Sequence, residues 1–153
     1  MQRTARSLSK TRWLRWFTIR FAHPLDLKLR GTRFAPSELV SAPLCYLTTT
    51  GRKSGEPREV PLLYVRLDDT PVVVASNYGQ QHHPAWSHNL DANPKARLDI
   101  DGTATEVVAR RATADEQDIL WPQFEEVWPG YQEYQKIAPR DIKMYVLEAP
   151  ASA

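Results

Sequence analysis

Short runs of hydrophobic residues, separated by glycine, proline and acidic turns, predict a mainly β-stranded region after residue 42. The apolar residues are nearly continuous over 60–65 and 72–74, which is typical of strands covered on both faces. Residues 95–101 instead alternate between polar and apolar positions, and the Asp101-Gly102 pair at their end is a strong hairpin signal. The predicted strands are 43–50, 58–66, 71–76, 95–101, 103–111 and 142–148.

Two helices are predicted among these strands. Residues 84–92 begin with a proline, which suits a first helical turn, and end before an Asn-Pro pair. Thr113 and Glu116 form a capping-box pattern, so a second helix is expected from there to about Trp128, before a Pro-Gly pair. The element order is β-β-β-α-β-β-α-β. Because hairpins dominate this order, we expect a largely antiparallel sheet, closed or nearly closed so that its edges are protected.

The start of the chain differs in character from the rest. Residues 1–33 hold nine Lys/Arg and one acid, although the net charge of the whole chain is only +2. Four aromatic residues between Trp13 and Phe21 fall on one helical face. A basic helix with such a face can lie on an anionic membrane or pack against the domain or a partner subunit. Nucleic acid ranks behind both, and we do not expect it as a partner.

These patterns divide the chain into a basic aromatic helix (1–23), a linker rich in Pro and Gly (24–42) and a compact domain (43–150). The length of 153 residues and the hydrophobic content of 42% fit one folded domain. The single cysteine, Cys45, excludes an internal disulfide and a cysteine-based zinc site. No apolar stretch reaches the roughly 18–20 residues of a membrane span. We therefore expect a cytoplasmic protein, peripheral at the inner face of the membrane if 1–23 binds lipid.

Candidate chemistry first appears in the loop at 51–57. Arg52 and Lys53 stand between two glycines, and Arg58 follows on the next strand. We expect the glycines to permit a tight backbone with exposed N–H groups, which together with three cations would suit a phosphate. A solvated basic turn is the alternative, and the spacing is not that of a Walker loop.

A second polar segment leaves the third strand and enters the first helix. Ser76 could donate a hydrogen bond there, and Trp86 could stack on a flat ring or pack into the core. His82, His83 and His88 suggest a metal, but their spacing lacks a fourth ligand, so we expect no metal.

A third group follows the second helix. Tyr131 and Tyr134 are three residues apart and would share a helical face, from which their hydroxyls could bond or protonate a substrate oxygen. Aromatic packing is the alternative. Because no hydrolytic triad, carboxylate pair or reactive thiolate is recognisable, a bound redox cofactor is favoured over hydrolysis.

Taken in order, these stretches resemble one enzyme family. They comprise Leu47–Gly55 with Pro57-Arg58, then Val74–Ser76 with His83–Trp86, Asn89-Leu90 and Ala92–Pro94, and last Pro129–Tyr131 with Tyr134-Gln135. They span about residues 43–148. The combination is similar to the deazaflavin-dependent nitroreductases of actinobacteria, also described as F420H2-dependent quinone reductases.

The resemblance implies an α+β fold: a split β-barrel of the flavin-reductase type, with about six mostly antiparallel strands and flanking helices. It implies hydride transfer from reduced coenzyme F420 to a quinone, an enone or a nitro compound. The alternatives are an FMN-binding oxidoreductase on the same barrel and a non-catalytic deazaflavin-binding or membrane-associated protein. Split barrels of this kind are often homodimers.

The resemblance also implies roles for individual residues. The phosphate and acidic tail of the cofactor would be held by Arg52, Lys53, Ser54 and Arg58. The ring and ribityl chain would be lined by Pro61, Leu62, Ala75, Ser76, Asn77, Trp86 and Asn89. Tyr131 and Tyr134 would face the substrate and, with Ser76, stabilise the developing oxyanion.

Two positions depart from the family pattern. Asn77 stands where many members have lysine, which removes a cation from near the cofactor. Trp128 stands where some have tyrosine, which removes a hydroxyl from the expected substrate pocket. The cofactor class is therefore a firmer expectation than the substrate.

Overall fold

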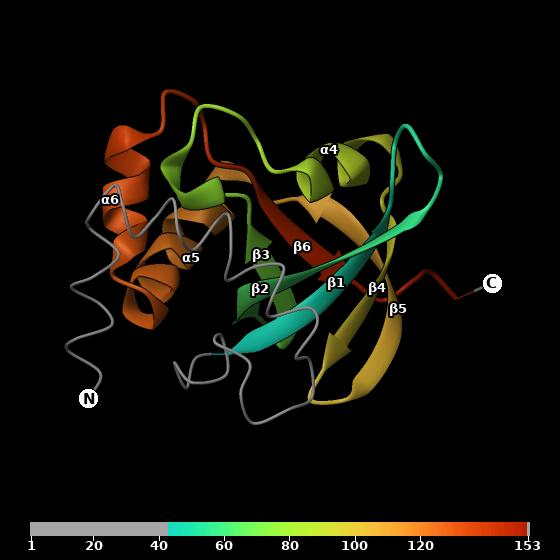
Figure 1. Cartoon of the computed structure of the whole chain (residues 1–153). Helices are drawn as coiled ribbons and strands as arrows, with labels where there is room; N and C mark the ends of the chain where they lie inside the picture. Colours follow the sequence, from blue (N-terminus) through green and yellow to red (C-terminus); the bar gives the residue numbers. More distant parts are fainter. Residues whose placement is uncertain (1–42, 153) are drawn as a thin grey trace.

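The computed structural model describes residues 43–152, so the expectations for 1–23 and 24–42 lie outside the described residues. Six antiparallel strands close into a barrel in the order β1-β2-β3-β6-β5-β4, with β4 pairing back to β1 (Figure 1). The strands are β1 (Leu44–Thr50), β2 (Pro57–Leu67), β3 (Thr70–Val74), β4 (Lys95–Ile100), β5 (Thr103–Arg111) and β6 (Met144–Glu148). The prediction of an antiparallel barrel is confirmed.

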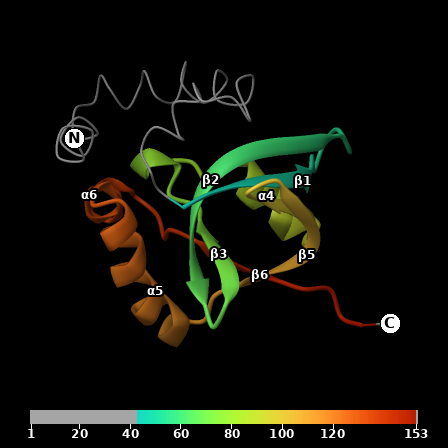
Figure 2. The same cartoon turned by 90° about the horizontal axis from the view of Figure 1, so that it is seen from below.

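The helices agree with the prediction at the start and differ after residue 127. α4 (Ala85–Ala92) and α5 (Ala114–Val127) lie where two helices were expected. A further helix, α6 (Gly130–Ile137), follows the Pro-Gly break, and the last strand begins two residues later than predicted. The loop after β3 contains a short 3-10 turn, η3 (Asn77–Gly79). Seen from below, α5 and α6 lie together on one side of the barrel (Figure 2).

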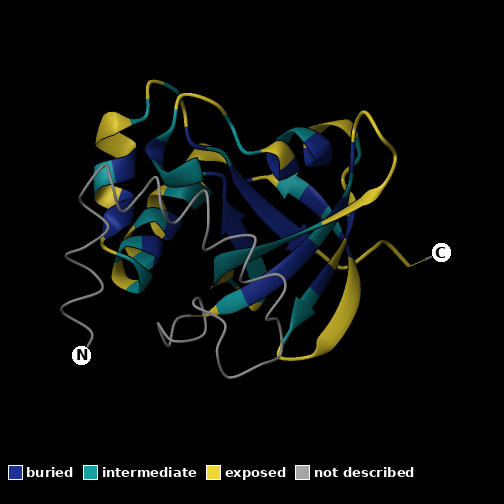
Figure 3. Cartoon of the chain, viewed as in Figure 1, coloured by how far each residue is buried: buried dark blue, intermediate teal, exposed yellow. Residues whose placement is uncertain are grey.

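Strand alternation divides the hydrophobic residues into two clusters, one inside the barrel and one beneath α5 and α6. On β3, Val73 belongs to the interior cluster, whereas Val72 and Val74 belong to the outer one. Tyr145 and Val146 of β6 divide in the same way. The continuous valine run is therefore buried along its whole length, as its sequence pattern predicted (Figure 3).

The short sequence motifs correctly predicted a hairpin turn and a helix cap. Asp101 and Gly102 both adopt left-handed conformations, with φ of 52° and 83°, as a two-residue hairpin turn requires. Thr113 caps α5: its hydroxyl accepts a bond from the N–H of Glu116, whose carboxylate accepts one from the N–H of Thr113. α4 lies on the barrel between the β1–β2 loop and the η3 turn (Figure 1).

Candidate functional site along helix α4

The loop between β1 and β2 is closed by its own backbone. The Gly51 N–H donates to the Glu56 carbonyl at 2.8 Å, and the Gly55 N–H donates to the Gly51 carbonyl at 2.8 Å. The loop is tight, as expected, and the amides of the two glycines are engaged within it. Within residues 43–152, the backbone N–H groups of Lys53 and Ser54 have no acceptor.

The cations of this loop are available for an anion. Arg52, Lys53 and Arg58 are exposed, and none has an ion pair within the described part of the chain. A Cβ at Gly51 would lie 2.5 Å from the Ser54 Oγ, so the glycine allows Ser54 to fold over the loop. Three unpaired cations and a hydroxyl match the donors that phosphate and carboxylate groups require.

Asn89 attaches this loop to α4. Its side chain is buried; its Nδ2 donates to the Thr49 Oγ1 at 3.0 Å, and its Oδ1 accepts from the Arg52 N–H at 3.0 Å. Both ends of the amide are thus engaged by the protein. Contact between Asn89 and the cofactor stays a prediction, and the observed bonds place the residue beneath the cationic loop.

The second part of the site is the turn after β3. Ala75 is buried in the interior cluster and Ser76 is half-buried. Asn77, Tyr78 and Gly79 then have φ of 45°, 56° and 72°, three left-handed conformations in succession. Backbone strain of this kind is concentrated at functional sites. The Asn77 amide donates to the His82 carbonyl at 2.8 Å, so the side chain at this departure from the family pattern closes the turn.

Tyr134 of α6 faces this turn, and Tyr131 packs between Tyr134 and Phe124 of α5. The ring of Tyr134 meets two other tyrosine rings edge-on. Its centroid lies 6.1 Å from that of Tyr78 and 5.8 Å from that of Tyr131. The Trp128 Nε1 donates to the Tyr134 hydroxyl at 3.4 Å. Burial raises the pKa of Tyr131 well above its usual value, so its phenol stays protonated. The predicted helical face shared by Tyr131 and Tyr134 is observed, and both residues are buried.

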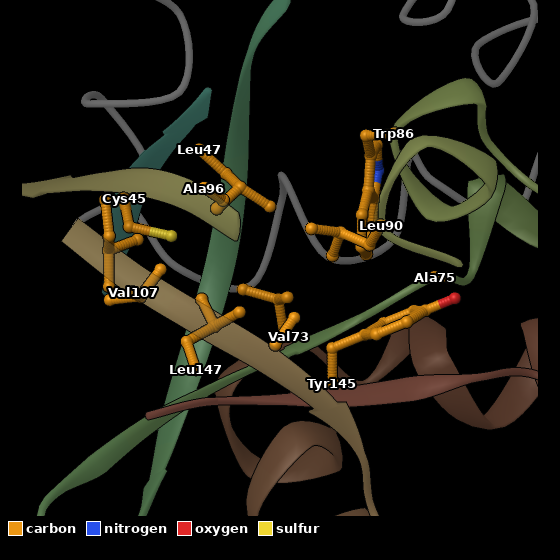
Figure 4. Packing of buried hydrophobic residues seen from close by; sticks show 12 residues of the cluster. Cys45, Leu47, Val73, Ala75, Trp86, Leu90, Ala96, Val107, Tyr145 and Leu147 are labelled. Atoms are coloured by element: carbon orange, nitrogen blue, oxygen red, sulfur yellow. The ribbon is translucent and has the colours of Figure 1, made fainter. Parts of the chain in front are cut away.

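Other predicted site residues lie in α4 and in strand β2 of the barrel. Trp86 is 6% exposed and packs edge-on against Tyr145 at 5.6 Å, beside Leu90 and Ala75 (Figure 4). This arrangement matches the core-packing alternative, and stacking of Trp86 on the cofactor stays a prediction. Leu62 packs against the interior cluster. Pro61 is its neighbour in β2 and so faces the opposite side of the sheet.

A polar cluster that sequence reasoning missed holds α4 against β6. The Tyr145 hydroxyl donates to Asp91 Oδ1 at 2.8 Å and lies 2.7 Å from the Ser87 Oγ. Lys143 pairs with the second oxygen of Asp91 at 2.6 Å. No sequence spacing links these residues, because they meet only when the barrel closes.

The rings of His83 and His88 meet edge-on, with their centroids 5.7 Å apart. The described residues contain no cluster of three or more metal-binding side chains.

The comparison with known sequences gives this arrangement a family. Residues 29–149 match the family described as F420H(2)-dependent quinone reductase. The chain belongs to this family. An F420H(2)-dependent quinone reductase of Mycobacterium tuberculosis is 32% identical over 143 residues, which cover 90% of this chain and 96% of the relative. The resemblance noted in the sequence is confirmed, and the protein is an oxidoreductase whose cofactor is coenzyme F420.

Two solved structures agree with this assignment. An F420-H2 dependent reductase, FDR-A, has a TM-score of 0.63 and 34% identity, covering 69% of this chain and 94% of its own. A second structure, described as a domain-swapped dimer, has a TM-score of 0.64 and 32% identity, and the match covers 89% of this chain and 97% of its own. The split-barrel fold of the flavin-reductase type is thereby confirmed, and the FMN alternative is not supported. The homodimer expected for this chain stays a prediction.

Among the helices of residues 43–152, none has the length and hydrophobicity needed to cross a membrane.

Proposed function

We propose that this protein reduces quinones with hydride from reduced F420, at a site running along α4 from the cationic loop to the α6 tyrosines. The observation behind this is the placement of three unpaired cations and a buried tyrosine cluster on either side of one helix. When bound, reduced F420 supplies a hydride and is oxidised, and the quinone with one further proton becomes the quinol.

The cationic loop is assigned to cofactor binding. Arg52, Lys53, Ser54 and Arg58 are placed to hold the phosphate and the acidic tail, since their donors are unpaired within the described residues. Ser76 and Asn77 directly precede Tyr78, whose ring contacts Tyr134, and this supports a place for them beside the deazaflavin ring. Pro61, Leu62, Ala75, Trp86 and Asn89 complete the proposed lining.

The tyrosines are assigned to the acceptor. Because burial keeps the phenol of Tyr131 neutral, it can donate a hydrogen bond to a developing oxyanion but cannot act as a base. The Tyr134 hydroxyl accepts a bond from the Trp128 Nε1, and we assign it a place beside the acceptor oxygen. Ser76 supplies a third hydroxyl at the same turn. The packed aromatics also exclude water from the acceptor.

The test is titration of the full-length protein with oxidised F420, with FMN as the control, followed by loss of F420H2 absorbance on adding menadione. We expect tight F420 binding, weak FMN binding and quinone-dependent oxidation; nitro and enone acceptors in the same assay define the substrate range. Binding without oxidation of F420H2 by any acceptor would mean a non-catalytic carrier, and no binding would remove the proposal.

Tyr134→Phe should lower turnover more than it lowers F420 affinity. Unchanged turnover would contradict the role of the Tyr134 hydroxyl at the acceptor.

We also propose that residues 1–23 bring the enzyme to an anionic membrane surface, where lipid-soluble quinones are held. The support is the excess of Lys/Arg and the aromatic face of that segment.

A further inference from the structure

Arg140, which lies between α6 and β6, makes an unusual set of contacts. Its guanidinium donates to the carbonyl oxygens of Ala75, Ser76 and Gln80 at 3.2, 3.1 and 3.2 Å. The same group lies 3.0 Å from the His83 Nδ1. It also donates to the carbonyl of its neighbour Asp141 at 3.3 Å. Apart from this last bond, the hydrogen bonds that Arg140 makes within residues 43–152 are all with the segment 75–83, about 60 residues away in the chain.

This segment needs support from elsewhere in the molecule. The Ala75 N–H donates to the Lys143 carbonyl. After Ala75, the backbone hydrogen bonds that the segment makes within residues 43–152 are local: the Gly79 N–H donates to Ser76 and the Gln80 N–H donates to Asn77. Local bonds set the shape of the turn but cannot set its position. Successive left-handed residues persist only when the surroundings over-determine them. Arg140 supplies such a tie, because its planar group can engage several carbonyls at fixed angles.

The protonation state of His83 agrees with this geometry. A guanidinium can only donate, so the facing Nδ1 must accept, which requires a neutral ring protonated on Nε2. Burial, and next the charge of Arg140, lower the pKa of His83 to about 4. The ring is therefore a neutral acceptor at physiological pH and completes the set of partners around Arg140.

We propose that Arg140 is a positioning residue, which holds the segment 75–83 so that Ser76 and Tyr78 are presented to the tyrosines of α6. Its structural effect is independent of the cofactor, whereas its effect on hydride transfer rests on the proposed function. Because the cationic loop is held by Asn89 and not by Arg140, removal of Arg140 should disturb the geometry at Ser76 and leave the main anion contacts in place.

The matched control is Arg110, a second arginine with several partners. It bonds Glu116 at 2.8 Å and Glu148 at 2.6 Å and makes no contact with the segment 75–83. Arg140→Ala, Arg140→Lys and Arg110→Ala are compared with the native protein. Arg140→Lys retains the charge and the aliphatic stem, so it provides a folded variant if the alanine variant does not fold.

The first measurement is amide hydrogen exchange of the cofactor-free proteins. We expect Arg140→Ala to speed exchange of the Gly79 and Gln80 amides about tenfold or more, Arg140→Lys to have a smaller effect in the same place, and Arg110→Ala to leave these amides unchanged. Unchanged exchange in the Arg140 variants, or an equal increase in Arg110→Ala, would overturn the positioning role. This measurement does not depend on F420 or on turnover.

The second measurement separates binding from chemistry. With Arg140→Ala we expect the Kd for oxidised F420 to stay within about threefold of the native value. The single-turnover rate of F420H2 oxidation by menadione should fall about tenfold or more, because small misplacements at the reacting centre are costly. A rate equal to native, or a loss matched by Arg110→Ala, contradicts the inference. If the native protein fails to oxidise F420H2, the proposed function fails, and the exchange result alone decides the role of Arg140.

Discussion

At the scale of single residues, Asn89 joins three parts of the site through one buried amide. It connects α4 to the end of β1 through Thr49 and to the cationic loop through the Arg52 N–H. A side chain with both a donor and an acceptor is needed to satisfy these two partners at once. The position of the loop therefore depends on an amide that the sequence suggested as a cofactor ligand.

Replacing this amide gives the first expected outcome. Asn89→Ala should lower the free energy of unfolding by about 1–3 kcal/mol, because the buried Thr49 hydroxyl and the Arg52 N–H lose their partner. The Kd for F420 should rise about tenfold as the loop loses its anchor. Denaturant unfolding and F420 titration provide the measurements. Asn93→Ala is the control, since Asn93 Oδ1 accepts from the exposed Lys95 N–H near the end of the same helix. Equal F420 affinity of both variants would rule out the anchoring role.

At the scale of elements, the η3 turn and α6 approach each other closely at one glycine. Gly79 has a φ of 72°, and a Cβ built there would lie 2.7 Å from the Ile137 Cγ1 and 3.2 Å from the Tyr134 Cα. The turn and the helix that carries the proposed catalytic tyrosines are therefore in direct backbone contact. Only a residue without a side chain permits this approach in this conformation.

A pair of glycine variants separates strain from packing. Gly79→Ala and Gly102→Ala place alanine at similar positive φ values, but no non-neighbouring atom of residues 43–152 lies within 4 Å of the Gly102 Cβ position. Gly102→Ala should lower the free energy of unfolding by about 1–2 kcal/mol, the cost of a left-handed alanine. Gly79→Ala should cost about 1–3 kcal/mol more, because it also displaces α6. Urea unfolding of both variants measures the difference, and equal losses would mean that α6 adapts without cost.

At the scale of the whole molecule, the basic charge is concentrated at the start of the chain. Residues 1–33 carry nine Lys/Arg and one acid, whereas the net charge of all 153 residues is +2. The remainder is therefore net acidic, so attraction of an anionic surface would be directed to one end of the sequence.

The proposed membrane contact follows from this asymmetry. The full chain should sediment with vesicles of anionic lipid, and a truncated chain that begins at Pro24 should stay in the supernatant. Vesicles of neutral lipid are the control, and added salt should weaken binding, because much of the attraction is between charges. Equal sedimentation of the two chains would favour packing of the segment against the protein or a partner.

Much of the fold could be predicted because its determinants are local. The strands, the Asp101-Gly102 turn and the Thr113 cap each depend on residues within a few positions of one another. The split of hydrophobic residues between two clusters could not be assigned. Alternation shows that Val73 faces away from Val72 and Val74, but only the positions of α5 and α6 show which side each faces.

The candidate site divides in the same way. By itself, the sequence determined the family, the F420 cofactor and the location of the cationic loop and the tyrosine pair, because these reside in short contiguous motifs. Only the tertiary structure decided that Asn89 lies beneath the loop, that Trp86 packs in the core and that Arg140 binds the carbonyls of the segment 75–83. Such contacts join residues tens of positions apart, and they exist only once the barrel has closed and its buried polar groups have found partners.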